Sequence, residues 1–513
     1  MQIESLENAL LSTVNPLLKL LIEKFDLECD QDGSLLVNSL KHFLGEEVKF
    51  CNSCGHLNHM MANPFYRIGS RLLRADTGFM RNMFLGQEYS DAWLKGFALM
   101  MRGIRKYGIR IPFTPAGPFE IVWNFTYSCN LRCKHCYENE GGHRPELTTD
   151  QACATIDVLS RIAKVGLPAL SFSGGEPLIR RDFYEVAAYA KKKIPYISIA
   201  TNGTLITRDV AKRLKEVRVD YVEISLDGAT KKVHEDFRRV LGCFEKTIEG
   251  IESCVEEGLD TCIAATAHKE NFSETTKILD LAERLGARFM HFNYVPTGRA
   301  KKYIHLDLTP EERLLLLETL GEKLVNRYMK AKEEEMTTGK TNISLDRIFS
   351  TCPQFARVVK RLSRERGENY TVPTHYAAKK GVEAAANFIG GCGAGRLYVG
   401  LEPNGDIKPC VFFPTNEQTR LGNILEDSFD RIWDTNELLW ELRTREKLEK
   451  YEVNGHIVGC GNCKDKYICG GCRARSYSYF NGDVHGADIG CIVNEELWKE
   501  IASQRISEIA SSH

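Results

Sequence analysis

Three cysteines in the first third of the chain have a spacing that suits metal chemistry. Cys129, Cys133 and Cys136 form a CxxxCxxC pattern. A structural zinc site takes four protein ligands, so three thiols do not complete one. Three thiolates can instead hold three irons of a [4Fe-4S] cluster and leave the fourth iron open for chemistry. A zinc knuckle, or a chance triplet of buried thiols, is the alternative interpretation.

Seven further cysteines lie toward the carboxyl terminus and are too many for one zinc ion. Their number approaches what two four-iron clusters need. A pair of zinc ribbons is the alternative. In chain order they are Cys392, Cys410, Cys460, Cys463, Cys469, Cys472 and Cys491.

Composition places the chain among ordinary folded proteins with two or three domains. It has 513 residues, of which 43% are apolar and 27% charged. The net charge of −1 gives no overall attraction to nucleic acid, and no apolar run reaches the ~18 residues that a membrane span needs. Eighteen cysteines without an amino-terminal signal segment indicate metal ligands in a reducing cytoplasm rather than disulfides.

Between residues 119 and 294, strand-like runs alternate with helical patterns. The alternation predicts a parallel sheet with right-handed crossovers, and six such units make a partial (β/α) barrel. Ligands of such sheets lie at the carboxyl ends of the strands, and the first three cysteines follow the first strand. Strands are expected at 119–126, 169–173, 196–200, 221–225, 261–266 and 289–294, and helices at 150–165, 182–193, 208–217, 244–257 and 274–285.

Short motifs follow the next three expected strands. They are Gly174-Gly175-Glu176-Pro177, Thr201-Asn202-Gly203 and Ser225-Leu226-Asp227-Gly228. Each is common by itself as strand-to-helix punctuation. Their order after CxxxCxxC, with Tyr137 directly behind the third cysteine, resembles the radical S-adenosylmethionine (SAM) enzymes.

That resemblance implies a catalytic cluster on Cys129, Cys133 and Cys136, whose open iron chelates the amino and carboxylate groups of SAM. In this family the cluster donates one electron, SAM splits, and a 5′-deoxyadenosyl radical takes hydrogen from an unactivated C–H bond. Paired glycines let backbone approach the SAM amino group, and arginine captures its carboxylate. Spacing does not separate Arg238 from its rival Arg239. The implied SAM contacts are Tyr137, Gly174, Gly175, Glu176, Asn202, Ser225, Asp227 and Arg238.

The carboxyl-terminal cysteines resemble the SPASM extension of these enzymes, with a shorter gap between Cys469 and Cys472. The resemblance implies two auxiliary [4Fe-4S] clusters, three clusters in all, and a low-potential electron donor such as ferredoxin or flavodoxin. The inner cluster is one protein ligand short. Cys352 is a candidate for it, and a non-cysteine group or an iron open to substrate are the alternatives. The implied ligands are Cys460, Cys463, Cys469 and Cys491 for the outer cluster and Cys392, Cys410 and Cys472 for the inner one.

The segment before residue 119 is the least familiar. An amphipathic helix is expected over 6–25 and another over 35–44. Cys51 and Cys54, followed by His56 and His59, could hold a mononuclear zinc or iron, with Cys29 lending a ligand. Four donors within nine residues is tight for a zinc finger, so the metal is only one of the interpretations.

The stretch 67–110 has nine basic and three acidic residues, and with its approach holds six of the ten methionines. Such a composition suits an anionic, apolar ligand or a membrane surface. The alternative is a helical cap that packs on the barrel with a solvated basic face.

The expected architecture is α/β. It comprises a helical amino-terminal domain (1–117), a partial (β/α)6 TIM-type radical SAM core (118–321), a helical linker (322–388) and a small Cys-rich SPASM domain (389–513). Four cysteines in apolar-periodic segments are expected in the core: Cys153, Cys243, Cys254 and Cys262. Five other residues are expected either to line the barrel mouth or to pack against neighbouring side chains: Tyr127, His135, Tyr137, Tyr294 and Arg299.

The expected function is a C–H-activating enzyme that forms a new bond. Carbon–carbon coupling on a long apolar lipid with an anionic head, such as an archaeal isoprenoid lipid, is favoured by the basic, Met-rich stretch. The alternative is a peptide or protein maturase that makes a thioether, a C–C crosslink or an oxidised side chain. An iron–sulfur electron carrier or scaffold is a third possibility, but it would need neither the GGE motif nor a SAM-binding arginine.

Val411 stands where sulfatase-maturing relatives carry a catalytic Asp, which argues against formylglycine formation. The expected location is the cytoplasm, with peripheral contact at the inner membrane face through the amino-terminal domain. No nucleic-acid partner is expected.

Overall fold

The computed structural model describes residues 28–29, 33–62, 81, 85–86, 90–138, 144–341, 343–345, 347–368, 370, 372 and 386–511. The helix expected over 6–25 lies outside the described residues. Much of the basic, Met-rich stretch also lies outside them, namely residues 63–80, 82–84 and 87–89. The same holds for the side chain of Cys29.

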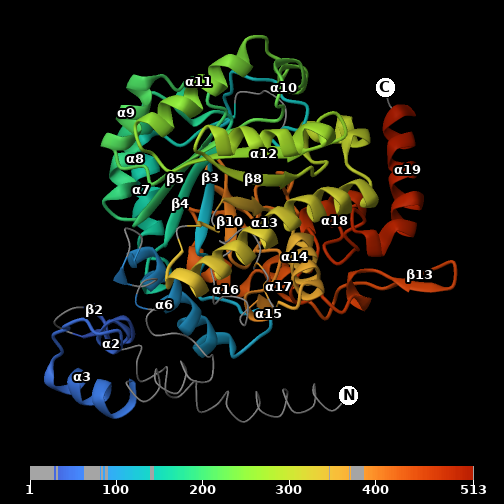
Figure 1. Ribbon diagram of the computed structural model, residues 1–513. Coiled ribbons are helices and arrows are strands. Elements are labelled where there is room, and N and C mark those ends of the chain that lie inside the picture. Colours follow the sequence, from blue (N-terminus) through green and yellow to red (C-terminus); the bar gives the residue numbers. More distant parts are fainter. Residues whose placement is uncertain are drawn as a thin grey trace.

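A sheet of ten strands, with the order β12-β11-β10-β3-β4-β5-β6-β7-β8-β9, forms the centre of the molecule (Figure 1). Six consecutive parallel strands make the partial barrel, and each begins and ends within one or two residues of its expected position. The α/β barrel architecture is therefore confirmed. These strands are β3 (Glu120–Thr126), β4 (Ala169–Gly174), β5 (Tyr196–Thr201), β6 (Tyr221–Ser225), β7 (Thr261–Ala267) and β8 (Arg288–Asn293).

Helices connect these strands and cover the outer face of the barrel (Figure 1). Helix α7 begins at a capping box in which Thr148 accepts from the backbone of Gln151, and the Gln151 side chain accepts from Thr148. Fully buried aliphatic and aromatic side chains from both layers fill the space between helices and strands. The helices are α7 (Thr149–Leu159), α8 (Phe183–Lys191), α9 (Arg208–Glu216), α10 (Lys231–Arg238), α11 (Cys243–Glu256) and α12 (Thr275–Arg284).

The sheet continues beyond the barrel on both sides. Strand β10 (Tyr398–Leu401) pairs in parallel with β3, and β11 (Asp406–Lys408) and β12 (Gly422–Asn423) follow it antiparallel. On the far side β9 (Ile348–Ser350) pairs in parallel with β8. The cysteine-rich segment is therefore built onto the first barrel strand, and the expected linker 322–388 contributes a strand as well as helices α13 (Pro310–Thr338) and α14 (Gln354–Glu365).

The carboxyl-terminal part beyond β12 consists of short elements that carry the remaining cysteines. They pack beside α13 and α14 and end in helix α19 at one edge of the molecule (Figure 1). They are α16 (Phe429–Thr435), α17 (Glu437–Arg443), the hairpin β13 (Tyr451–Val453) and β14 (His456–Val458), α18 (Arg473–Tyr479) and α19 (Glu495–Ser511), and α15 (Ala386–Ile389) precedes β10.

The amino-terminal helices form a small lobe of their own. Its apolar cluster joins α2 (Leu35–Phe43) and α3 (Asn52–Leu57) to α6 (Ser90–Tyr107), and β1 (Glu28–Cys29) pairs with β2 (Gly33–Ser34). Basic residues of α6 contact the rest of the chain: Arg102 donates to the Ala163 carbonyl after α7, and Lys106 pairs with Asp434 of α16. In the part of the chain that the structure describes, no helix combines the length and the apolarity that crossing a membrane requires.

Candidate active site

The loop that follows β3 brings the first three cysteines together. Cys129, Cys133 and Cys136 pack around Leu131, and Cys243, expected only as a core residue, is buried in the same group. Burial raises the pKa of Cys129 to about 11 and that of Cys136 to about 12. These thiols therefore keep their protons at neutral pH until a metal displaces them.

Hydrogen bonds and stacking hold this loop in place. Arg299 donates from its backbone to the Cys136 carbonyl at 2.9 Å and from Nη1 to the Cys133 carbonyl at 3.0 Å. The His135 ring stacks on Phe237 with centroids 4.7 Å apart. His135 and Arg299, two of the residues expected either to line the barrel mouth or to pack, thus support the cysteine loop.

The end of β4 lies directly against the cysteine loop. Gly174 has φ +115°, and a Cβ on Gly175 would lie 2.1 Å from the Ser128 carbonyl oxygen, so only glycine fits there. Glu176 is fully buried, and its carboxylate accepts from the Thr201 hydroxyl and the Asn202 backbone, each at 2.8 Å. Glu176 therefore joins the ends of β4 and β5, and its contact with the SAM amino group stays a prediction.

The structure separates Arg238 from Arg239. Arg238 is buried and reaches Asp227 Oδ2 with Nε at 2.7 Å and Nη2 at 2.6 Å, while its Nη1 lies 3.6 Å from Cys133 Sγ. Arg239 is exposed and caps α10 with φ +62°. Of the two, Arg238 thus lies at the cysteine loop, and Ser225, at the end of β6, is half-buried.

Asn202 connects the end of β5 to the cysteine loop. Its Nδ2 donates to Asn130 Oδ1 at 2.8 Å, and its Oδ1 accepts from the Thr204 backbone at 2.9 Å. All the residues with implied SAM contacts therefore lie at the carboxyl ends of β3, β4, β5 and β6 or in the elements that follow them. Tyr294 is another aromatic residue expected at the mouth. Its hydroxyl donates a hydrogen bond to the Ala300 carbonyl, inside the fold.

A buried polar network at the barrel mouth escaped sequence reasoning. Asn124 of β3 donates to Glu138 at 2.7 Å and to Glu402 at 3.0 Å, and accepts from the Tyr137 hydroxyl at 3.1 Å. Lys408 Nζ lies 2.5 Å from Glu402. Burial raises the pKa of Glu138 to about 7, which Lys408 partly offsets. No local signal marks Glu402 or Lys408, because they reach the site only when β10 and β11 join the sheet.

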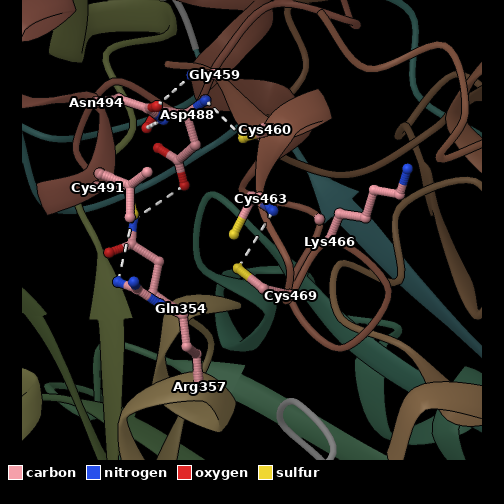
Figure 2. Close-up of a pocket in the computed structure, with 13 residues that line it drawn as sticks. Gln354, Arg357, Gly459, Cys460, Cys463, Lys466, Cys469, Asp488, Cys491 and Asn494 are labelled. Carbon is pink, nitrogen blue, oxygen red and sulfur yellow. Dashed lines mark hydrogen bonds between the residues drawn. The ribbon is translucent and has the colours of Figure 1, made fainter. Parts of the chain in front are cut away.

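Four carboxyl-terminal thiols line one pocket, shown in Figure 2. The pocket measures about 340 Å³, its open mouth included. Arg357 of α14 and Asp488 lie at its walls. The four thiols are Cys460, Cys463, Cys469 and Cys491, the ones expected to hold the outer auxiliary cluster.

Donors surround the sulfurs of this pocket. The Asp488 backbone donates to Cys460 Sγ at 3.3 Å, and Gly471 donates to Cys469 Sγ at 3.4 Å. Arg357 Nη2 lies 3.4 Å from Cys491 Sγ. Such donors stabilise thiolates and the negative charge of an iron–sulfur cluster.

The three thiols expected to hold the inner cluster belong to another group. Cys392 and Cys410 are buried in one apolar cluster, and Cys472 and Tyr398 pack against it. The Cys392 backbone donates to the Cys469 carbonyl at 3.1 Å. Because the chain from Cys469 to Cys472 is so short, the inner and outer thiol groups are neighbours.

Cys352 belongs to a different buried cluster from these three thiols. It is fully buried in the main core cluster, and its backbone donates to Ser350 Oγ at 3.1 Å. The guanidinium groups of Arg475 and Arg313 are the charges that act on it most strongly after burial. Its expected role as a ligand stays a prediction.

The amino-terminal CxxC motif is only partly assembled. The Cys54 backbone donates to Cys51 Sγ at 3.5 Å, and Cys54 is buried among apolar side chains. His56 and His59 are exposed. The described residues therefore do not gather these four donors, and a zinc or iron at this motif stays a prediction.

The donor sets differ from those of single-ion sites. Throughout the described ranges, no group of three or more His, Cys, Asp or Glu side chains is arranged to hold a metal ion. One zinc ion draws its thiolates to about 2.3 Å from a single point, whereas a four-iron cluster gives each thiolate an iron of its own. The pocket with four thiols and N–H donors fits a cluster in this respect.

Comparison with protein families independently supports a radical SAM enzyme that contains iron–sulfur clusters. Residues 123–282 match the radical SAM superfamily, and residues 392–472 match SPASM, an iron–sulfur cluster-binding domain. An AdoMet-dependent heme synthase of Methanosarcina barkeri is 34% identical over 379 residues, 73% of this chain and 96% of that protein. An Fe-coproporphyrin III synthase of the same organism is 30% identical over 387 residues, 73% of this chain and 88% of that protein.

More distant relatives share the same architecture. A mycofactocin maturase, MftC, of Mycobacterium ulcerans is 29% identical over 381 residues, 73% of this chain and 88% of that protein. The solved structure of Streptococcus suis SuiB bound to S-adenosylmethionine superimposes with a TM-score of 0.55 at 18% identity, covering 84% of this chain and 89% of SuiB. At that identity the structural likeness concerns the fold.

Proposed function

The chain belongs to the radical SAM superfamily, with a SPASM extension, and on that premise we propose that it acts on a C–H bond of a heme-type tetrapyrrole. The supporting observation is the match to two synthases, named for heme and for Fe-coproporphyrin III, at 34% and 30% identity. The match covers 96% and 88% of those proteins, so it spans their length rather than one shared motif.

SAM and iron–sulfur clusters are the cofactors of this enzyme. We assign three [4Fe-4S] clusters: one to the cysteine loop after β3, one to the outer pocket and one to the inner thiol group. When bound, these groups and SAM supply a 5′-deoxyadenosyl radical and a route for single electrons. Arg299 and Arg238 hold the cysteine loop, and the Gly174-Gly175 backbone, which lies directly against this loop, would approach the amino group of bound SAM.

The residues between the cysteine loop and the inner thiols suit a large apolar substrate. Tyr137 and Phe412 meet edge to face at 5.3 Å, and Val295 and Val411 are buried in the same apolar cluster. Lys408, a buried cation 5.9 Å from the Tyr137 ring, is paired with Glu402 and Glu138. The flat apolar ring of a heme-type macrocycle matches such an apolar wall.

The lipid substrate favoured by the sequence finds no support in these relatives. Basic residues in and just after α6 also engage the protein itself: Lys106 of α6 pairs with Asp434, and the Arg110 guanidinium, beyond the end of α6, lies 5.0 Å from the Trp440 ring. This is the arrangement of a helical cap. The electron-carrier alternative is disfavoured as well, because the relatives are named as synthases and maturases.

A peptide substrate is the second candidate. It is supported by the 29% identity to the mycofactocin maturase over 88% of that protein. In either case the electron donor is expected to be a low-potential protein such as ferredoxin or flavodoxin.

The test is an anaerobic turnover assay on reconstituted full-length protein with SAM and dithionite. Iron-coproporphyrin III and related tetrapyrroles are offered in one set of reactions and candidate precursor peptides in another. We expect 5′-deoxyadenosine to form together with a mass change of the macrocycle. Formation of 5′-deoxyadenosine with an unchanged macrocycle and a modified peptide would select the second candidate. A variant with Cys133→Ala, which removes one ligand of the catalytic cluster, is the negative control.

A further inference from the structure

Three thiols make up the inner group, and a residue on β10 lies beside them as a fourth possible ligand. This step rests on the cluster assignment of the proposed function. Cys392, Cys410 and Cys472 supply three thiolates, whereas a fully protein-bound [4Fe-4S] cluster takes four ligands. The fourth must come from a side chain that already faces these three.

Tyr398, the first residue of β10, faces them. Its hydroxyl oxygen lies 3.6 Å from Cys410 Sγ. Its ring packs against the buried apolar cluster that contains Cys392 and Cys410 and that Cys472 also contacts. Tyr398 therefore shares one cluster with all three thiols.

The backbone fixes the Tyr398 ring in this position. A Cβ on Gly393 would lie 2.9 Å from Tyr398 Cε1, so the ring rests directly on the backbone that follows Cys392. The Tyr398 backbone donates to the Gly393 carbonyl at 3.2 Å, and β10 pairs with β3 from Tyr398 onward. Glycine at 393 is what allows this contact, because any larger residue would displace the ring.

Cys352, the other candidate, is placed differently. It belongs to the main core cluster with Phe355, whereas the three thiols and Tyr398 share another cluster. Its backbone donates to Ser350 Oγ at 3.1 Å, at the end of β9.

We propose that Tyr398 Oη is the fourth ligand of the inner auxiliary cluster. Tyrosinate oxygen is an established ligand of protein iron. The Fe–O bond forms as the phenol O–H bond breaks and its proton passes to solvent, and no oxidation state changes. An inner cluster closed in this way transfers electrons without binding substrate at iron.

Resonance Raman spectroscopy on the reconstituted three-cluster protein tests this assignment. Protein with natural tyrosine is compared with protein grown on ring-deuterated tyrosine. We expect tyrosinate–iron bands that shift with the label and disappear in Tyr398→Phe. They should persist in Tyr477→Phe, a control in the same apolar cluster whose hydroxyl donates to Gln418 at 2.9 Å.

Three results would overturn the assignment. They are the absence of such bands from wild-type protein with full iron content, their persistence in Tyr398→Phe, and a changed inner-cluster EPR signal in Cys352→Ala but not in Tyr398→Phe. Iron analysis and 5′-deoxyadenosine separate this from the proposed function. Wild-type protein with about 12 irons per chain and active SAM cleavage, but without the bands, refutes the Tyr398 ligand alone. Protein that lacks this iron refutes the cluster assignment, and the Tyr398 ligand with it.

Discussion

Replacing Arg357 by leucine should lower the reduction potential of the outer auxiliary cluster. The Arg357 guanidinium lies 3.4 Å from Cys491 Sγ at the edge of the four-thiol pocket. At an effective dielectric constant of about 20, a unit charge at that distance is worth ~4.9 kcal/mol. The electron added on reduction is shared among four ligands, so about a quarter of this interaction energy, ~1.2 kcal/mol, applies to the charge at Cys491. For a one-electron couple this corresponds to a decrease of ~50 mV.

The assay is an anaerobic potentiometric titration followed by EPR, with wild type and variants reconstituted to equal iron content. Arg357→Lys keeps the charge and should recover most of the potential. Arg361→Leu is the matched control, because Arg361 lies on the same helix, is exposed and pairs with Glu318 and Glu365. An unchanged potential in Arg357→Leu, or an equal decrease in Arg361→Leu, would show that the pocket does not hold the cluster.

Three further predictions concern the barrel. Arg238→Lys loses the two-pronged carboxylate pairing at 2.7 and 2.6 Å, so SAM cleavage should fall about 10- to 100-fold at unchanged iron content. Arg239→Lys, exposed, should leave the rate unchanged, and equal losses would contradict the assignment. Burial and a nearby glutamate raise the pKa of Glu223 to about 8, above its value in the unfolded chain. The free energy of unfolding therefore carries no penalty from Glu223 at low pH, and it decreases as the pH rises toward 8. In Glu223→Gln, the decrease of the unfolding free energy with pH should be smaller by about 2 kcal/mol in anaerobic denaturant titrations. The pKa shift alone would give at most ~5 kcal/mol, and partial exposure of the side chain reduces this value. Gly175→Ala places a Cβ 2.1 Å from the Ser128 carbonyl oxygen, so cluster content should fall to less than about half. A fully loaded Gly175→Ala protein would show that the two loops need not approach this closely.

The barrel strands were predictable because their signal is local. Strand β6 covers Tyr221–Ser225, the expected range, and the other five end within one or two residues of expectation. Each is a short run between polar turns, and in β3, β4, β5 and β7 most residues are buried, whereas β6 and β8 alternate between buried and half-buried residues. A parallel strand covered by helices has this pattern whatever its neighbours are.

The additions to the sheet were not predictable in the same way. Strand β9 has three residues, too few for a periodic pattern. Strand β10 pairs with β3, which precedes it by more than 270 residues, and nothing near Tyr398 indicates that partner. Three of the four consecutive domains expected from the sequence, the core, the linker and the Cys-rich domain, therefore share one sheet.

The thiols that are candidate metal ligands could be named from the chain alone, because their spacing is a local property. The barrel and the order of its motifs could be predicted in the same way. What surrounds each thiol became clear only from the folded chain. The tertiary structure distinguished Arg238 from Arg239, and it placed Arg357 at the outer pocket and Tyr398 at the inner thiols. The physical reason is that the field at a buried sulfur falls off with distance in space, and the charges and dipoles nearest to it come from segments that only folding brings together.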